Sequence, residues 1–131
     1  MDKIVADKLP ITRDKTGAKR WVEERGEFVQ VSYREEIRHL ALFEIKQGFS
    51  RGGHYHGRKE EIFYIASGKI EAKFLDLDTQ EKAKRVLEKG DRLRIRPRCA
   101  HLFTAIEDTI IVEYSPQFYD PEDSYRVDLT G

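Results

Sequence analysis

Residues 53–68 read GHYHGRKEEIFYIASG, and residues 90–101 read GDRLRIRPRCAH. Glycines bound the first stretch and open the second, and the two hold three of the chain's four histidines. His54 and His56 are two positions apart, so a β-strand turns both imidazoles to one face. Glu61 can share that face across a turn, for which residues 57–59 supply polar side chains. His101 would join them from a distant strand.

Three imidazoles and one carboxylate form a set of donors that suits a divalent transition metal ion and leaves room for water or substrate. The sequence therefore predicts a metal site made of His54, His56, Glu61 and His101. Manganese, iron, cobalt, nickel, copper and zinc all accept such ligands, so the identity of the ion stays open. We interpret the fourth histidine, His39, as a surface or hydrogen-bonded residue.

The rest of the chain shows short alternating or apolar runs separated by turn residues, without sustained helical spacing. Strands are expected at residues 21–24, 27–33, 37–46, 61–66, 69–75, 83–87, 92–96, 102–106 and 109–114. This pattern predicts an all-β, antiparallel domain of the sandwich or jelly-roll barrel type. In such a barrel, side chains alternate between the interior and the solvent. Phe63 and Phe103 would then line the same cavity as the metal ligands and contact the substrate.

The two quoted stretches resemble the first and second motifs of the cupin superfamily over residues 37–115. The resemblance implies a cupin-type double-stranded β-helix, and it assigns Glu61 rather than Glu60 as the ligand, because six residues separate Glu61 from the closing Gly68. Two positions depart from the usual second motif, with Cys99 in place of a turn glycine and Ala105 in place of an asparagine. Neither is a predicted ligand. Cys99 is expected to be a small buried residue.

A narrower resemblance, to the sugar 3,4-ketoisomerases and more remotely the 3,5-epimerases, rests on Arg51-Gly52 before the histidine pair and on the tail, residues 115–126. It implies that Arg51 grips the diphosphate of a nucleotide-linked sugar. Ketoisomerases do not depend on a metal and tend to lack the carboxylate ligand that Glu61 would supply here.

Three functions remain open at this point. The first is isomerisation or epimerisation of a keto sugar, in which His54 or His56 carries protons if it is not a metal ligand. The second is a metal-dependent oxygenase or lyase that acts on a small organic acid or diketone. The third is a cupin that binds a small molecule without turnover. Arg51 and the tail, residues 115–126, favour isomerisation or epimerisation of a keto sugar.

Arg92, Arg94 and Arg96 alternate along one strand. We expect them to form a solvated outer face rather than a phosphate site. Lysine plus arginine and aspartate plus glutamate each number 24, so no net field favours nucleic acid or a membrane as a partner. No apolar run is long enough to span a bilayer.

The chain of 131 residues predicts a single domain. Within it, residues 1–36 would hold N-terminal strands at a homodimer interface, residues 37–115 the barrel, and residues 116–131 a tail. One cysteine and no secretory leader favour the cytoplasm. A content of 37% charged residues with no asparagine is typical of thermophilic proteins.

Overall fold

The structure is a computed structural model that describes residues 1–130. In this range the chain forms only β-strands and connecting segments. The strands are β1 (Ile4–Lys8), β2 (Lys19–Glu23), β3 (Gly26–Gln30), β4 (His39–Ile45), β5 (Ser50–Tyr55), β6 (Glu61–Ser67), β7 (Lys69–Asp76), β8 (Lys82–Glu88), β9 (Asp91–Ile95), β10 (Cys99–Ala105), β11 (Thr109–Ser115) and β12 (Tyr125–Arg126). No helix long and apolar enough to cross a membrane occurs in residues 1–130.

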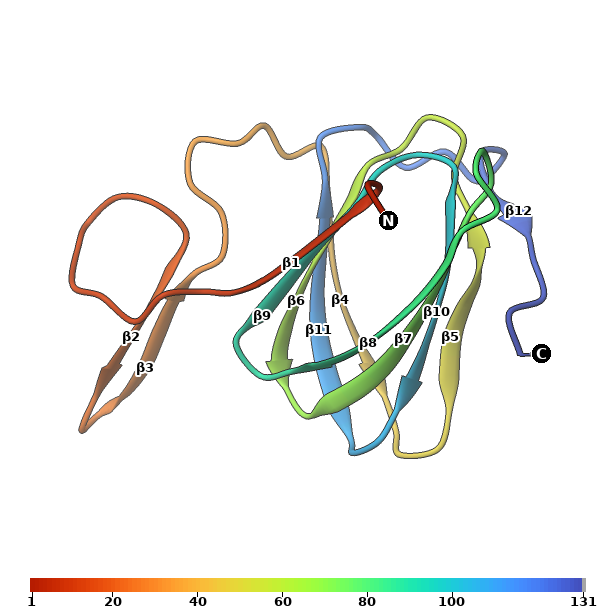
Figure 1. Cartoon of the computed structure of the whole chain (residues 1–131). Helices are drawn as coiled ribbons and strands as arrows, with labels where there is room; N and C mark the ends of the chain where they lie inside the picture. Colours follow the sequence, from red (N-terminus) through yellow and green to blue (C-terminus); the bar gives the residue numbers. More distant parts are fainter. Residues whose placement is uncertain (131) are drawn as a thin grey trace.

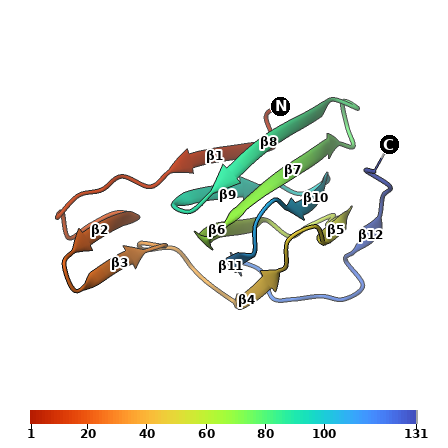
Figure 2. The same cartoon turned by 90° about the horizontal axis from the view of Figure 1, so that it is seen from below.

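Ten of the strands form two five-stranded sheets that face each other as a barrel (Figures 1 and 2). One sheet has the order β1-β9-β6-β11-β4, and the other has the order β12-β5-β10-β7-β8. All pairings within them are antiparallel. Strands β2 and β3 form a separate hairpin that stands away from the barrel (Figure 1). The predicted all-β cupin jelly roll is confirmed.

Alternation along the strands creates the interior of the barrel. On β6, Phe63 and Ile65 point between the sheets and pack with Phe74 and Phe103 from the opposite sheet, and all four are at most 2% exposed. Burying aromatic and branched side chains of this kind contributes on the order of 2 kcal/mol each. The apolar interior therefore supports the strands that carry the predicted ligands.

The outer face of β9 differs from the solvated surface that the alternating arginines predict. The guanidinium of Arg92 donates a hydrogen bond to the carbonyl of Val31 at 2.8 Å, and that of Arg94 pairs with Glu35 at 2.7 Å and also with Glu60. These contacts hold the segment between β3 and β4 against the sheet. The expectation of a solvated face was therefore wrong for Arg92 and Arg94, and it holds for Arg96, which is exposed.

The C-terminal tail returns to the barrel and covers the turn between β5 and β6. The side chain of Arg58 in this turn pairs with Asp120 at 2.9 Å, and the amide of Glu60 donates to Gln117 at 2.8 Å. The tail then pairs with β5 as the short strand β12, which places Arg126 opposite His54. The segment that follows the second motif thus borders the predicted site.

Candidate functional site

The predicted ligands converge from four places in the fold. His54 lies near the end of β5 and His101 lies on β10, where the two residues are direct partners in the ladder. His56 follows β5, and Glu61 begins β6 in the opposite sheet. A ligand atom from each of the four residues lies within 4.8 Å of those from the other three. The structure thus brings together the whole set that the sequence singles out.

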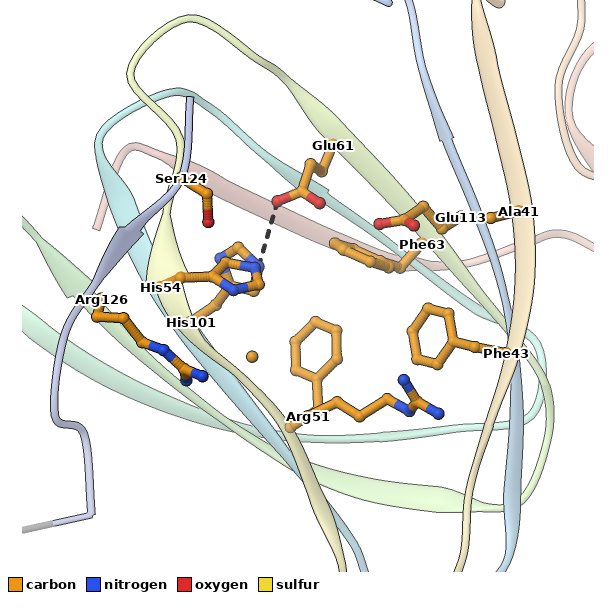
Figure 3. Close-up of a pocket in the computed structure, with 12 residues that line it drawn as sticks. Ala41, Phe43, Arg51, His54, Glu61, Phe63, His101, Glu113, Ser124 and Arg126 are labelled. Atoms are coloured by element: carbon orange, nitrogen blue, oxygen red, sulfur yellow. Dashed lines mark ion pairs between the residues drawn. The ribbon is translucent and has the colours of Figure 1, made fainter. Parts of the chain in front are cut away.

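One carboxylate oxygen is the centre of this cluster. Oε1 of Glu61 lies 3.2 Å from Nε2 of His56 and 3.2 Å from Nε2 of His101, the second of which is drawn as a dashed line in Figure 3. The side chains of Glu61, His56 and His101 are buried, whereas His54 is half-buried and borders the cavity.

Backbone carbonyls fix the orientation of two of the rings. Nδ1 of His56 lies 2.6 Å from the carbonyl oxygen of Asp123, and Nδ1 of His101 lies 3.2 Å from that of Cys99. A carbonyl only accepts, so each Nδ1 carries the hydrogen and each neutral ring presents the lone pair of Nε2 to Glu61. Two lone pairs and a carboxylate repel one another unless a cation, either a proton or a metal ion, lies among them.

The local electrostatics agree with a site that attracts a cation. Burial would raise the pKa of Glu61, but the charge and hydrogen bond of His101 and the contact with His56 bring it well below its usual value. Burial and then the neighbouring His101 and His56 lower the pKa of His54 to about 4. For His56, burial is outweighed by the hydrogen bond to Glu61, and its pKa is raised. The carboxylate is therefore ionised at neutral pH.

A cavity of about 480 Å³ opens beside the cluster. Its lining residues are Ala41, Phe43, Arg51, Gly52, His54, Glu61, Phe63, His101, Phe103, Glu113, Ser124 and Arg126. The predicted substrate-binding residues Arg51, Phe63 and Phe103 all belong to this lining. Among the predicted site residues, only His56, which is buried, is not part of the cavity wall.

Charges of opposite sign occupy opposite sides of this cavity. Figure 3 shows Glu61 and Glu113 on one side and the guanidinium groups of Arg51 and Arg126 on the other. The guanidinium of Arg51 lies 5.5 Å from the ring centroid of Phe43, and its Nε donates to a backbone carbonyl of β4. The terminal nitrogens of Arg51 thus stay directed at the cavity.

Three residues of this site escaped sequence reasoning. Glu113 lies on β11 at an inward position, and its Oε1 is 3.7 Å from Nε2 of His39. Burial and the carboxylate of Glu61 raise the pKa of Glu113 to about 7. The signal for it was a single charged residue at an inward position of an apolar strand. Ser124 and Arg126 belong to the tail, residues 115–126, on which the narrower resemblance rests, but nothing in the sequence placed their side chains at the cavity.

Two further residues near the cluster have structural explanations. Cys99 is 1% exposed in the core, and burial raises the pKa of its thiol to about 11, which confirms the expected buried residue. Lys59 is buried as well, with Nζ 3.7 Å from Oε2 of Glu61 and 5.5 Å from the ring centroid of Tyr119. Its ammonium therefore lies beside the oxygen of Glu61 that does not face His56 and His101.

The fold and the site together define a cupin-type barrel with a histidine and carboxylate cluster at one side of its cavity. The sequence matches the family model described as the polysaccharide biosynthesis C-terminal domain over residues 21–125. The chain belongs to this family. A search of curated proteins matches none of them.

Solved structures show the same fold at low sequence identity. The dTDP-4-dehydrorhamnose 3,5-epimerase from Sulfolobus tokodaii is 20% identical with a TM-score of 0.81, over 99% of this chain and 80% of that chain. A variant of the 3,4-ketoisomerase QdtA from Thermoanaerobacterium thermosaccharolyticum was solved with TDP-4-keto-6-deoxyglucose. It is 14% identical with a TM-score of 0.77, over 96% of this chain and 88% of that chain. CapF, solved with the inhibitor 3-isopropenyl-tropolone, is 21% identical with a TM-score of 0.65, over 86% of this chain and 34% of that chain. The predicted likeness to cupins of the epimerase and ketoisomerase type is confirmed.

Proposed function

We propose that this protein isomerises or epimerises a nucleotide-linked keto sugar by proton transfer next to the carbonyl. The observation that carries the proposal is the division of charge in the cavity, with Glu61 and Glu113 on one side and two arginines on the other. A nucleotide-linked sugar divides in the same way, into a neutral sugar and an anionic diphosphate. The epimerase and ketoisomerase neighbours, which are named for or solved with dTDP-linked keto sugars, support the assignment.

The diphosphate would bind between Arg51 and Arg126. Guanidinium groups form paired, charge-assisted hydrogen bonds with phosphate oxygens, and two such groups from adjacent strands can hold both phosphates. Phe63 and Phe103 contribute an apolar wall, with ring centroids 4.9 Å apart in an edge-to-face arrangement. The pyranose ring would pack against this wall with its carbonyl toward Glu61.

We also propose that His54, His56, Glu61 and His101 hold one divalent transition metal ion. The donors fit such an ion, because four ligand atoms lie within 4.8 Å of one another and the two fixed rings present Nε2 to a shared carboxylate oxygen. When bound, the ion would polarise a carbonyl and stabilise the negative charge that forms when a neighbouring proton leaves.

The proton must then be moved by a group that is not a ligand. His54 and His56 cannot coordinate an ion through Nε2 and accept a proton there at the same time. Of the other residues that line the cavity, Glu113 is the one whose side chain can accept and return a proton near neutral pH. We assign this role to Glu113, which lies across from the arginines (Figure 3).

The test is an exchange experiment. The purified protein, loaded with each candidate metal, is incubated in heavy water with a panel of dTDP- and UDP-4-keto sugars and followed by NMR. Deuterium at a carbon next to the carbonyl, together with an inverted centre or a shifted carbonyl, is expected for at least one sugar. No exchange across the panel would rule the proposal out. Oxygen consumption with an organic acid or diketone would favour the oxygenase instead.

We further propose a homodimer that uses the N-terminal hairpin. Val22 and Phe28 on this hairpin are 56% and 57% exposed, and Leu40 and Leu42 on β4 are each 67% exposed. Strand β4 is at the edge of its sheet, so its outer hydrogen-bonding groups have no partner strand within residues 1–130. Light scattering should report twice the 15.4 kDa chain mass. A 15.4 kDa particle at micromolar concentration would contradict the dimer.

A further inference from the structure

Asp123 connects the C-terminal tail to the turn between β5 and β6. Its carboxylate accepts hydrogen bonds from the backbone amides of Gly57 at 2.8 Å and Arg58 at 3.1 Å. The residue is 5% exposed, although it belongs to a tail of mostly exposed side chains. Burial would raise the pKa of Asp123, but the two amides lower it below its usual value. The charged carboxylate is therefore the form that this turn binds.

The backbone of the same residue reaches the metal site. The carbonyl oxygen of Asp123 lies 2.6 Å from Nδ1 of His56, across 67 positions of sequence. Residue 123 thus makes three hydrogen bonds to three consecutive residues, His56, Gly57 and Arg58, two through its side chain and one through its main chain. The side-chain bonds fix the place of the main-chain carbonyl, because both belong to one residue.

We propose that Asp123 is a positioning residue that keeps the hydrogen of His56 on Nδ1 and directs Nε2 into the cluster with Glu61. Partners that lie behind a metal-binding histidine set its tautomer and ring orientation, and their loss typically lowers metal affinity about 10-fold to 100-fold. Here the partner is a main-chain carbonyl of the tail, so the tail is part of the site and not only a cover. This inference rests on the proposed metal site.

His101 provides an internal comparison. Its Nδ1 is held by the carbonyl of Cys99, which lies two residues earlier on the same strand. That contact does not involve the tail, so a change at Asp123 should leave the tautomer of His101 as it is. A ring that depends on the tail and a ring that does not are therefore present in one site.

The experiment uses the full chain with its histidines labelled with ¹⁵N, freed of metal by a chelator and kept at about pH 9. Long-range ¹H–¹⁵N correlation spectra show which ring nitrogen carries the hydrogen. In the wild type, His56 and His101 should both carry it on Nδ1. In D123A, His56 should become a mixture of both tautomers while His101 stays unchanged. D120N, which removes the negative charge that pairs with Arg58 in the same tail, is the matched control and should change neither ring.

Calorimetry with Zn²⁺ alone supplies a second readout. The affinity of D123A should fall at least 10-fold, and that of D120N should equal the wild type. If D123A does not fold, D123N replaces it in both measurements. Asparagine keeps one acceptor oxygen but turns an amide toward the other backbone donor. D123N should therefore shift the tautomer population of His56 in the same direction.

The inference is overturned if a folded Asp123 variant leaves His56 unchanged, or if His101 and the D120N protein change equally. The spectra need neither metal nor sugar. A wild type that binds no Zn²⁺ would therefore count against the proposed metal site alone, while the tautomer of His56 would still decide the role of Asp123.

Discussion

His54 and His101 are direct partners across β5 and β10, and the register of the two strands shifts immediately beyond this pair. Leu102 is opposite Gly52, so Gly53 has no partner of its own and forms the bulge. The bulge allows two imidazoles from strands nearly fifty residues apart to point at the same carboxylate. Their ring centroids are 5.0 Å apart.

This arrangement predicts a specific cost for a side chain at Gly52. Its φ is +105°, and a Cβ there would lie 2.7 Å from the carbonyl oxygen of His101, a contact that the backbone has to relieve by moving. We expect Gly52→Ala to lower the free energy of unfolding by about 3 kcal/mol or more. Gly17→Ala is the matched control, because its φ is +84° with no atom within 4 Å, and it should cost about 1 kcal/mol. Urea unfolding measures both, and equal losses would contradict the role of the close approach.

Metal binding should appear as thermal stabilisation. An ion that binds only the folded state adds about 2.7 kcal/mol at a concentration of 100 times Kd. For a domain of this size, that raises Tm by about 10 °C. The shift should vanish in H101Q and persist in H39Q, since His39 lies outside the cluster. Differential scanning calorimetry with and without Zn²⁺ tests this, and an unchanged shift in H101Q would refute the assigned ligands.

The two arginines of the cavity should each contribute to anion binding. Hydrogen bonds to charged groups are worth roughly 1.5–3 kcal/mol, so R51M and R126M should each weaken the binding of dTDP by about 10-fold or more. R25M is the control, because the side chain of Arg25 is 86% exposed on the hairpin. Calorimetry at low salt measures the affinities. If R25M and R126M weaken dTDP binding equally, the diphosphate does not bind at Arg126.

Glu113→Gln separates proton transfer from metal binding. The amide keeps the shape of the side chain but cannot take up a proton, so deuterium exchange into the keto sugar should fall by at least about 100-fold. Zn²⁺ affinity should stay within about threefold, because Glu113 is not one of the four clustered ligands. Full exchange activity in E113Q would contradict the role of Glu113 and indicate that a histidine transfers the proton.

The dependence of stability on pH should carry a contribution from Asp76. The hydrogen bond from Lys3 lowers the pKa of Asp76 from 3.8 to about 2. A group with a lowered pKa in the folded state stabilises it above its unfolded pKa, and this stabilisation is lost as the pH falls through the folded value. D76N should therefore be less stable than the wild type at pH 6, with a difference that shrinks between pH 4 and pH 2. Urea titrations at each pH test this, and a difference that stays constant between pH 6 and pH 2 would contradict it.

Much of the site could be predicted because the four clustered residues lie in short segments bounded by glycines. His54, His56 and Glu61 lie within eight consecutive residues at the end of β5, in the following turn and at the start of β6, and Gly90 opens the segment that leads through β9 to His101 on β10. The inward positions of Phe63 and Phe103 followed from alternation alone. Local pattern was sufficient wherever one strand and its turn determine the direction of a side chain.

What local pattern could not supply is the result of long-range pairing. Strand β12 is two residues long, and its register with β5 places Arg126 at the cavity. Strand β1 lies at a sheet edge with four of five residues exposed, so it lacks the alternation that marks a strand. The partly buried state of Arg92 and Arg94 likewise depends on Glu35, from a segment without regular structure.

The hairpin of β2 and β3 shares few contacts with the barrel, and its tip at Arg25 is exposed. A two-stranded ribbon of this kind opens at a smaller free energy than the sheets that surround the core. Its amides should therefore exchange with deuterium well before those of β6 and β10, and trypsin should first cut the folded chain near this tip. Such a nick would leave every residue that lines the cavity on one intact fragment.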